Sequence, residues 1–276
     1  YFFLIYYVFG YRKKVVLSNL KLAFPEKTDA ELKLISKKFF KHFTDLIIET
    51  IKGFSISEKQ ILKRYTYKNP ELVNNFAKQG KSIALVSPHQ ANWEWSSNLP
   101  LVLLDCNLNA TYASLGNKYF DNIVKKTREK FGGTCYASSK TVKAIHTDYS
   151  NKKQGLYFLI SDQSPQLEHT VYWKTFFGIN VPVHIGAEII AKKFNLVVIY
   201  ADTKKVKRGF YETEFKLITD SPKELKNYKI TNEYFNLTEK TVKEQPEFYL
   251  WSHKRFKHKD KFDDWEKLFA AKKSKL

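Results

Sequence analysis

Three short apolar runs, separated from one another by helical patterns, constrain the fold of this chain most. The runs lie at residues 82–87, 156–161 and 196–201, and none of them alternates apolar with polar residues. Strands of that composition are covered on both faces, as in a parallel sheet between two layers of helices. The helical patterns that separate or flank the runs lie at 117–131, 141–151 and 186–194. The order predicts an α/β fold with a mostly parallel central sheet flanked by helices.

End signals predict further elements. Residues 28–31 form a capping box that begins a long helix running to about residue 53, and 57–60 form a second box before a short helix. Asn69-Pro70 begins another helix, which Gly80 ends. Residues 108–113 are predicted to form a strand, and 210–218 alternate as an edge strand would.

The chain opens on nine apolar or aromatic residues, followed by Arg12-Lys13-Lys14, and it contains no methionine. Nine residues are too few to span a bilayer, which takes about 20. We therefore expect that residue 1 is not the native start, and that residues 1–14 are the C-terminal part of a membrane anchor helix with its basic end on the cytoplasmic side. A buried first helix is the alternative. Residues 15–258 would then form one domain, with a basic tail at 259–276 that is either an amphipathic surface helix or frayed.

The charge of the chain limits its partners. Lys and Arg number 47 against 28 Asp and Glu, a formal net charge of +19. Such an excess attracts nucleic acid, anionic lipid headgroups or an acidic protein, but no zinc finger or RNP-type strand favours nucleic acid. Two cysteines cannot build a disulfide framework, and no metal-ligand, P-loop or dinucleotide motif predicts a metal or a bound cofactor.

Candidate catalytic residues follow the first apolar run. His89 lies at the predicted carboxyl end of that strand, where ligand sites gather in α/β sheets. Glu94 lies five residues later, and the two side chains can meet if His89 is in the loop and Glu94 is in the first turn of a helix capped by Asn92. Glu94 would then orient one imidazole nitrogen and leave the other as a general base. A loop histidine bonded to backbone is the alternative. The absence of a GxSxG sequence favours direct base catalysis over a covalent intermediate.

The segment Pro88-His89-Gln90-Ala91-Asn92-Trp93-Glu94 resembles the H-x4-D/E block of the glycerolipid and lysophospholipid acyltransferase superfamily. Its Asn-Trp-Glu ending resembles the lipid A biosynthesis lauroyl/myristoyl (late) acyltransferase family. Five further blocks occur in that family's order: residues 19–26; Tyr112, Asn117, Lys118, Arg128, Phe131 and Gly132; Ser161-Asp162-Gln163; Phe176-Phe177-Gly178 with Pro182; and the W-x-H-x-R block at 251–257. The resemblance therefore spans residues 12 to about 258.

This resemblance implies an O-acyltransferase with an N-terminal single-pass anchor at the cytoplasmic face of the bacterial inner membrane. It implies transfer of a fatty acyl group from acyl-acyl carrier protein, or from acyl-CoA, to a hydroxyl of a lipid A precursor or a related lipid. Acyl carrier protein, anionic membrane lipids and the lipid acceptor are the implied partners, with no nucleic acid and no cofactor besides the acyl thioester.

The matching blocks also imply roles for residues. His89 and Glu94 are the catalytic pair, and Arg128 is a candidate donor to the oxyanion, with backbone near Asn92 as another. Asp162 either shapes the site or holds Arg128, and Gln163 and Arg255 are substrate-binding candidates, the latter for an acceptor phosphate.

Two departures from the family pattern leave the acceptor open. Gln90-Ala91 replaces an aromatic-Gly pair, and Ala113-Ser114-Leu115 follows Tyr112 where an Arg and a Pro are common. A lysophospholipid or an amino-acid lipid is an alternative acceptor. A non-catalytic protein that binds anionic membrane or nucleic acid through its basic surface is the alternative of another class.

Overall fold

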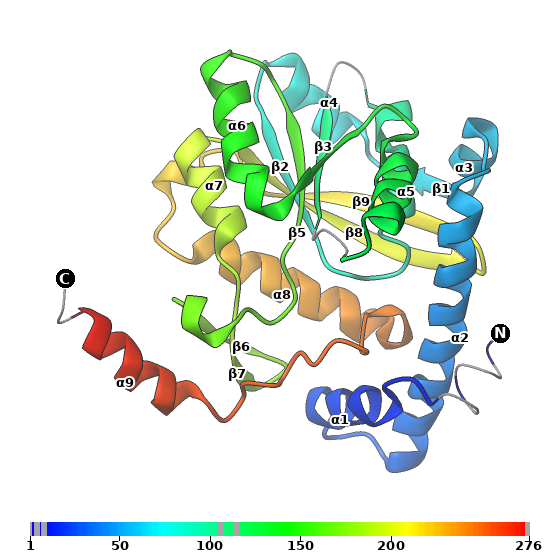
Figure 1. Cartoon of the computed structure of the whole chain (residues 1–276), viewed down its shortest axis with the longest axis vertical. Coiled ribbons are helices and arrows are strands. Elements are labelled where there is room, and N and C mark those ends of the chain that lie inside the picture. Colours follow the sequence, from blue (N-terminus) through cyan, green and yellow to red (C-terminus); the bar gives the residue numbers. More distant parts are fainter. Residues whose placement is uncertain (1, 3–5, 7–9, 104–106, 113–115, 274–276) are drawn as a thin grey trace.

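The computed structural model describes residues 2, 6, 10–103, 107–112 and 116–273 (Figure 1). The helices are α1 (Lys13–Ala23), α2 (Asp29–Gly53), α3 (Glu58–Arg64), α4 (Glu71–Lys78), α5 (Lys118–Glu129), α6 (Thr141–Ser150), α7 (Gly186–Phe194), α8 (Lys229–Glu244) and α9 (Phe262–Lys273). The strands are β1 (Tyr65–Tyr67), β2 (Ile83–Ser87), β3 (Leu108–Tyr112), β4 (Thr134–Ala137), β5 (Leu156–Ile160), β6 (Trp173–Phe176), β7 (Ile179–Pro182), β8 (Val197–Lys207) and β9 (Phe210–Thr219). Short 3₁₀ helices include η2 (Trp95–Leu101) and η6 (Pro246–Phe248).

The central sheet has seven strands in the order β1-β9-β8-β2-β5-β3-β4. Every neighbouring pair in it is parallel except β8 with β9, which form an antiparallel hairpin. The predicted α/β fold with a mostly parallel sheet is confirmed. The prediction that 210–218 is an edge strand is wrong, because the three-residue strand β1 pairs with β9 and takes the edge.

Helices cover both faces of the sheet, which explains the unbroken apolar runs. On one face Ala84 and Val86 of β2 pack with side chains of α1, α2, α7 and α8. On the other face Ile83 and Leu85 pack with α4 and η2. Because successive side chains of a strand point to opposite faces, both sets must be apolar.

The predicted helix starts are observed. Thr28 and Glu31 form a reciprocal capping box before α2, and Ser57 and Gln60 form the same box before α3. Each box satisfies backbone donors that the first turn of a helix leaves without a partner. α4 is followed by Gly80 at a φ of 74°, as a helix C-terminus favours.

Residues 1, 3–5 and 7–9, half of the predicted anchor, lie outside the described residues, as does the departure at 113–115. Within the part of the chain that the structure describes, no helix has the length and apolar character needed to cross a bilayer. The tail forms helix α9, whose Phe262 and Trp265 pack against Trp173 of β6, and this end of the chain projects from the body of the molecule in Figure 1.

Candidate active site

The centre of the site forms where two neighbouring strands end. β2 and β5 run parallel, with Ser87 paired to Ile160, and His89 and Asp162 each lie two residues beyond that pair. Equal offsets from the same register position bring the two side chains to one edge of the sheet. His89 Nδ1 lies 2.6 Å from Asp162 Oδ1.

The surroundings of Asp162 fix its charge and the tautomer of His89. Its side chain is 1% exposed, and its Oδ2 accepts the His89 backbone N–H at 3.2 Å. Burial acts to raise the pKa of Asp162, but the charge and hydrogen bonds of His89, with a hydrogen bond from Tyr249, outweigh burial and lower that pKa. An ionised carboxylate only accepts hydrogen bonds, so Nδ1 carries the proton and Nε2 of His89 keeps a lone pair.

A single tyrosine joins the ends of the two strands. Tyr234 of α8 is buried, and its hydroxyl donates to the carbonyl oxygen of Ser87 at 3.0 Å. The same hydroxyl accepts the backbone N–H of Ser161 at 3.3 Å. The positions just before His89 and Asp162 are therefore tied to each other through one oxygen atom.

Glu94 has a different partner from the predicted one. Arg128 of α5 donates from Nε and Nη2 to the two carboxylate oxygens of Glu94 at 2.8 and 2.7 Å. Burial acts to raise the pKa of Glu94, but the hydrogen bonds and charge of Arg128 outweigh it and lower that pKa. The predicted orientation of His89 by Glu94 is wrong in this structure: the carboxylate is held by a bidentate pair, and the imidazole is held by Asp162.

The loop after His89 is held from behind by α2. Asn92 is buried, and its Nδ2 donates to Glu49 Oε2 at 2.7 Å while its Oδ1 accepts the Trp95 backbone N–H at 3.0 Å. The Asn92 side chain thus accepts the first backbone N–H of η2, a 3₁₀ helix that replaces the predicted α-helix and has Glu94, not Asn92, as its N-cap residue. Its side chain is committed to these protein contacts, so it supports the site and does not bind substrate.

His42 of α2 holds the same loop at Ala91. Its Nε2 lies 3.0 Å from the Ala91 carbonyl oxygen, and its Nδ1 lies 3.1 Å from Lys205 Nζ. Because the ammonium can only donate, Nδ1 accepts and Nε2 donates. Ala91 has a φ of 55°, a left-handed conformation that alanine adopts only when its surroundings impose it.

Sequence reasoning missed His42, Glu49 and Tyr234. His42 and Glu49 lie seven residues apart among the apolar positions of the α2 pattern, and that was the available signal. A polar residue on the buried face of a helix needs a partner. No comparable local signal marks Tyr234.

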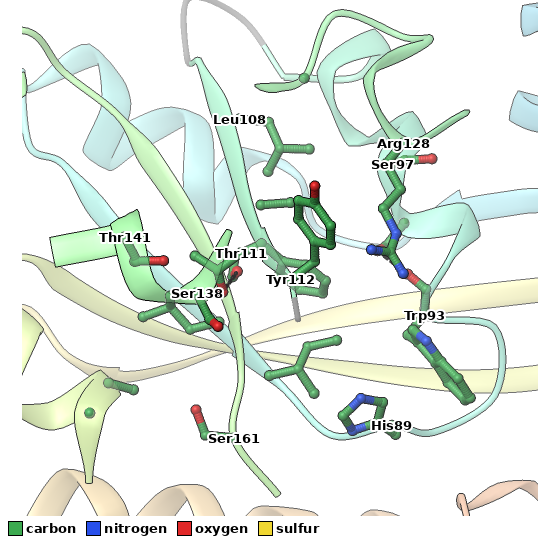
Figure 2. A pocket seen from close by; sticks show the side chains of 18 of the residues that line it. His89, Trp93, Ser97, Leu108, Thr111, Tyr112, Arg128, Ser138, Thr141 and Ser161 are labelled. Carbon is green, nitrogen blue, oxygen red and sulfur yellow. Dashed lines mark hydrogen bonds between the residues drawn. The ribbon is translucent and has the colours of Figure 1, made fainter. Parts of the chain in front are cut away.

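A cavity of about 740 Å³ opens beside His89, within the range of small-molecule sites. β3 and β5 pair over only three residues, 108–110 with 156–158, and the ends of both strands line the cavity beyond that point. Its apolar lining includes Leu108, Ala110, Val142, Phe158, Leu159, Ile160, Ala187, Ile190 and Leu250. Figure 2 shows His89 beside Trp93 at one end, Arg128 next to them, and Ser138 and Thr141 at the far side. The cavity therefore joins a polar end at His89 to a mostly apolar space.

Of the remaining predicted site residues, Gln163 lies at the cavity and Arg255 is buried in the protein. Gln163 lines the cavity, as do His89, Glu94 and Arg128. Arg255 is 1% exposed, donates from Nη1 to the Pro182 carbonyl oxygen at 3.3 Å, and has its guanidinium 5.3 and 5.5 Å from the ring centroids of Phe176 and Phe235. The predicted contact of Arg255 with an acceptor phosphate does not fit this burial. Over the described ranges, no group of three or more His, Cys, Asp or Glu is arranged to hold a metal ion.

Comparisons with known proteins agree with this architecture. The family profile "Bacterial lipid A biosynthesis acyltransferase" matches residues 4–258. The "Lipid A biosynthesis acyltransferase 2" of Shigella flexneri is 22% identical over 243 residues, which is 87% of this chain and 76% of that protein. The "Lipid A biosynthesis acyltransferase" of Haemophilus influenzae is 24% identical over 85% of this chain and 72% of its own length. The "Lipid A biosynthesis myristoyltransferase" of Escherichia coli is 21% identical over 62% of this chain and 52% of its own.

The fold and the matched family define an enzyme that transfers acyl groups to oxygen, an O-acyltransferase. The chain belongs to the bacterial lipid A biosynthesis acyltransferase family. The alternative of a non-catalytic binding protein is thereby set aside.

Proposed function

We propose that this protein transfers a fatty acyl group from an acyl thioester to a hydroxyl of a lipid A precursor, with His89 as the general base. The observation that carries the proposal is the His89–Asp162 pair, because it leaves the free imidazole nitrogen at the end of a cavity with an apolar lining. The choice of a lipid A precursor as acceptor follows the names of the family and of the relatives.

The reaction needs no covalent enzyme intermediate. The acceptor oxygen attacks the thioester carbonyl while Nε2 of His89 takes its proton. Asp162 stabilises the imidazolium that forms, as the carboxylate of a catalytic triad does. The tetrahedral intermediate then collapses, the carbon–sulfur bond breaks, and the imidazolium returns the proton to the leaving thiolate.

Arg128 is the best-placed cation for the oxyanion. Its Nε and Nη2 are used by Glu94, and Nη1 has no partner among the residues that the structure describes. We assign Glu94 the task of holding the guanidinium in place, so that Nη1 donates to the negative charge as it develops.

The donor and location are part of the same proposal. The net charge of +19 suits an acidic acyl carrier protein as the thioester donor and an anionic membrane surface. We propose that the enzyme works at the cytoplasmic face of the bacterial inner membrane, where a lipid acceptor is at hand.

Lipid mass spectrometry of cells with and without the gene tests the function. Loss of the gene should remove one acyl group from lipid A, and wild-type protein, but not His89→Ala, should restore it. A mass change confined to lysophospholipids or to amino-acid lipids would replace the acceptor. Full restoration by His89→Ala would contradict the base mechanism.

A further inference from the structure

The C-terminal half of α2 presents apolar side chains to solvent. Ile47, Ile48, Ile51 and Phe54 are exposed large hydrophobic residues, and their spacing places them on one side of the helix. Single exposed apolar residues are ordinary, whereas a contiguous group indicates an interaction surface. We call these four residues the α2 stripe.

Two aromatic side chains from the N-terminal part of the chain pack against the first half of α2. Earlier along α2, Tyr6 packs edge-on against Phe40 at 5.3 Å, and Tyr11, itself exposed, stacks on Phe43 at 6.0 Å. Tyr11 therefore adds an exposed aromatic side chain beside this helix, whereas Tyr6 and Phe40 are buried in the core.

The exposed charges along α2 after its first turn are positive. Between residues 32 and 57 the acidic residues are Asp45 and Glu49, and both are turned inward. Asp45 pairs with Lys205 and Arg208, and Glu49 accepts from Asn92 and Tyr211. The exposed ionisable residues of this stretch are lysines, among them Lys41 and Lys52.

The stripe also borders the catalytic site. Phe54 lines a small crevice together with Thr127, Arg128 and Glu94. A lipid that reached the site along this side of the molecule would pass the stripe before it met Arg128.

We propose that the α2 stripe, with its flanking lysines, seats the enzyme on a bilayer containing anionic lipid. Apolar side chains enter the headgroup boundary while cations contact anionic headgroups, as in interfacial helices. This inference rests on the proposed function in one respect: a lipid acceptor has to be collected from a membrane. An acidic protein partner is less suited to this surface, because the α2 stripe itself is uncharged and gives the acidic side chains of such a partner nothing to pair with.

Vesicle flotation tests the proposal. The full chain is mixed with phosphatidylcholine vesicles with and without phosphatidylglycerol. Wild-type protein should float with the anionic vesicles, and Ile48→Ser/Ile51→Ser should weaken binding about tenfold, because it removes two exposed apolar side chains that would enter the headgroup boundary. Ile189→Ser is the matched control, since Ile189 of α7 is 53% exposed against 61% for Ile51, and it should bind as wild type does.

Three outcomes would overturn the inference: wild-type protein that does not float, a stripe variant that floats like wild type, or an Ile189 control that loses as much. Normal flotation of the stripe variant with loss of binding to acyl carrier protein would make the face a protein-docking surface. Acyl transfer to acceptor in detergent micelles separates this inference from the proposed function. The stripe variant should keep micellar activity, whereas absence of micellar activity in wild type would contradict the function alone.

Discussion

The two carboxylates of the site are held in different ways. Asp162 is 1% exposed and binds the imidazole of His89. Glu94 is 20% exposed, lines the cavity, and accepts hydrogen bonds from Nε and Nη2 of Arg128. Asp162, a buried carboxylate beside an imidazole, governs the proton affinity of the base. Glu94, a carboxylate in a bidentate pair with an arginine, governs where that cation lies. The comparison therefore assigns proton transfer to one pair and charge placement to the other.

The largest expected effect is loss of the base. His89→Ala should lower kcat by about 10³–10⁴-fold, the upper range for general acid–base catalysis, because no other described group takes the acceptor proton in the proposed mechanism. The thermal midpoint should stay near that of wild type, since His89 lies at the cavity edge. Turnover near the wild-type rate in a folded His89→Ala variant would contradict the assignment of proton transfer to the His89–Asp162 pair.

Asp162→Asn should come next, with a loss of about 10²–10³-fold in kcat. The amide keeps the volume but does not stabilise an imidazolium, and it also offers a donor to Nδ1. Steady-state kinetics in micelles measure the effect, and Asp148→Asn on α6, which holds Tyr157 through a hydrogen bond of 3.0 Å, serves as a buried-aspartate control.

Glu94→Gln should cost about 10–10²-fold in kcat/KM, because Arg128 loses its bidentate partner and its fixed position. The single variants Glu94→Gln and Arg128→Gln and the double variant form a double-mutant cycle. Losses that fail to add would show that the pair acts as a unit; additive losses would assign the two residues separate tasks.

Tyr234→Phe removes one oxygen atom and should lower kcat about threefold to tenfold while KM changes little. The strand ends would lose the bridge between Ser87 and Ser161, and the His89–Asp162 pair would be less well aligned. Tyr200→Phe is the control, because its buried hydroxyl bonds to Thr241 and to neither Ser87 nor Ser161. Equal kinetic losses in both variants would point to a general effect on packing.

The smallest effect concerns stability in mild acid. Burial, and then the Lys205 ammonium, lower the pKa of His42 to about 3, and burial with Arg255 lowers the pKa of His253 to about 4. An unfolded histidine titrates near 6.5, so below that pH the unfolded chain binds more protons and the folded state loses stability, by about 1.4 kcal/mol per pH unit for each histidine. The lowered pKa values of Asp162 and Glu94 add stability that is lost only below about pH 4.

Urea unfolding between pH 5 and 6.5 measures this slope. His42→Gln should make it shallower. An identical slope in His42→Gln and wild type would mean that His42 is not held neutral behind the loop.

Sequence patterns located β2, β5 and β8 because these strands are covered on both faces. The apolar runs at β2, β5 and β8 mark their strands, and the capping boxes mark the starts of α2 and α3. β1 was not predicted, because a strand of three residues is too short to show an alternating pattern. Without β1, β9 was predicted to be the edge strand, whereas β1 pairs with it in the structure.

The site was predicted less completely because its partners are distant in sequence. His89 and Arg128 were found from the strand end and the family block, but the carboxylate for His89 was sought five residues away, and the structure supplies it from 73 residues away. A pairing of that kind depends on the register of β2 against β5, which local spacing does not encode.

The pH dependence of kcat/KM tests the division between the two carboxylates most directly. In Asp162→Asn the imidazole loses its negative neighbour, so the acid limb of the profile should move to lower pH. The double variant Glu94→Gln/Arg128→Gln removes a charge pair of zero net charge and should reduce the rate with the limb unmoved. A limb that stays in place in Asp162→Asn and moves in the double variant would contradict the assignment of His89 to Asp162.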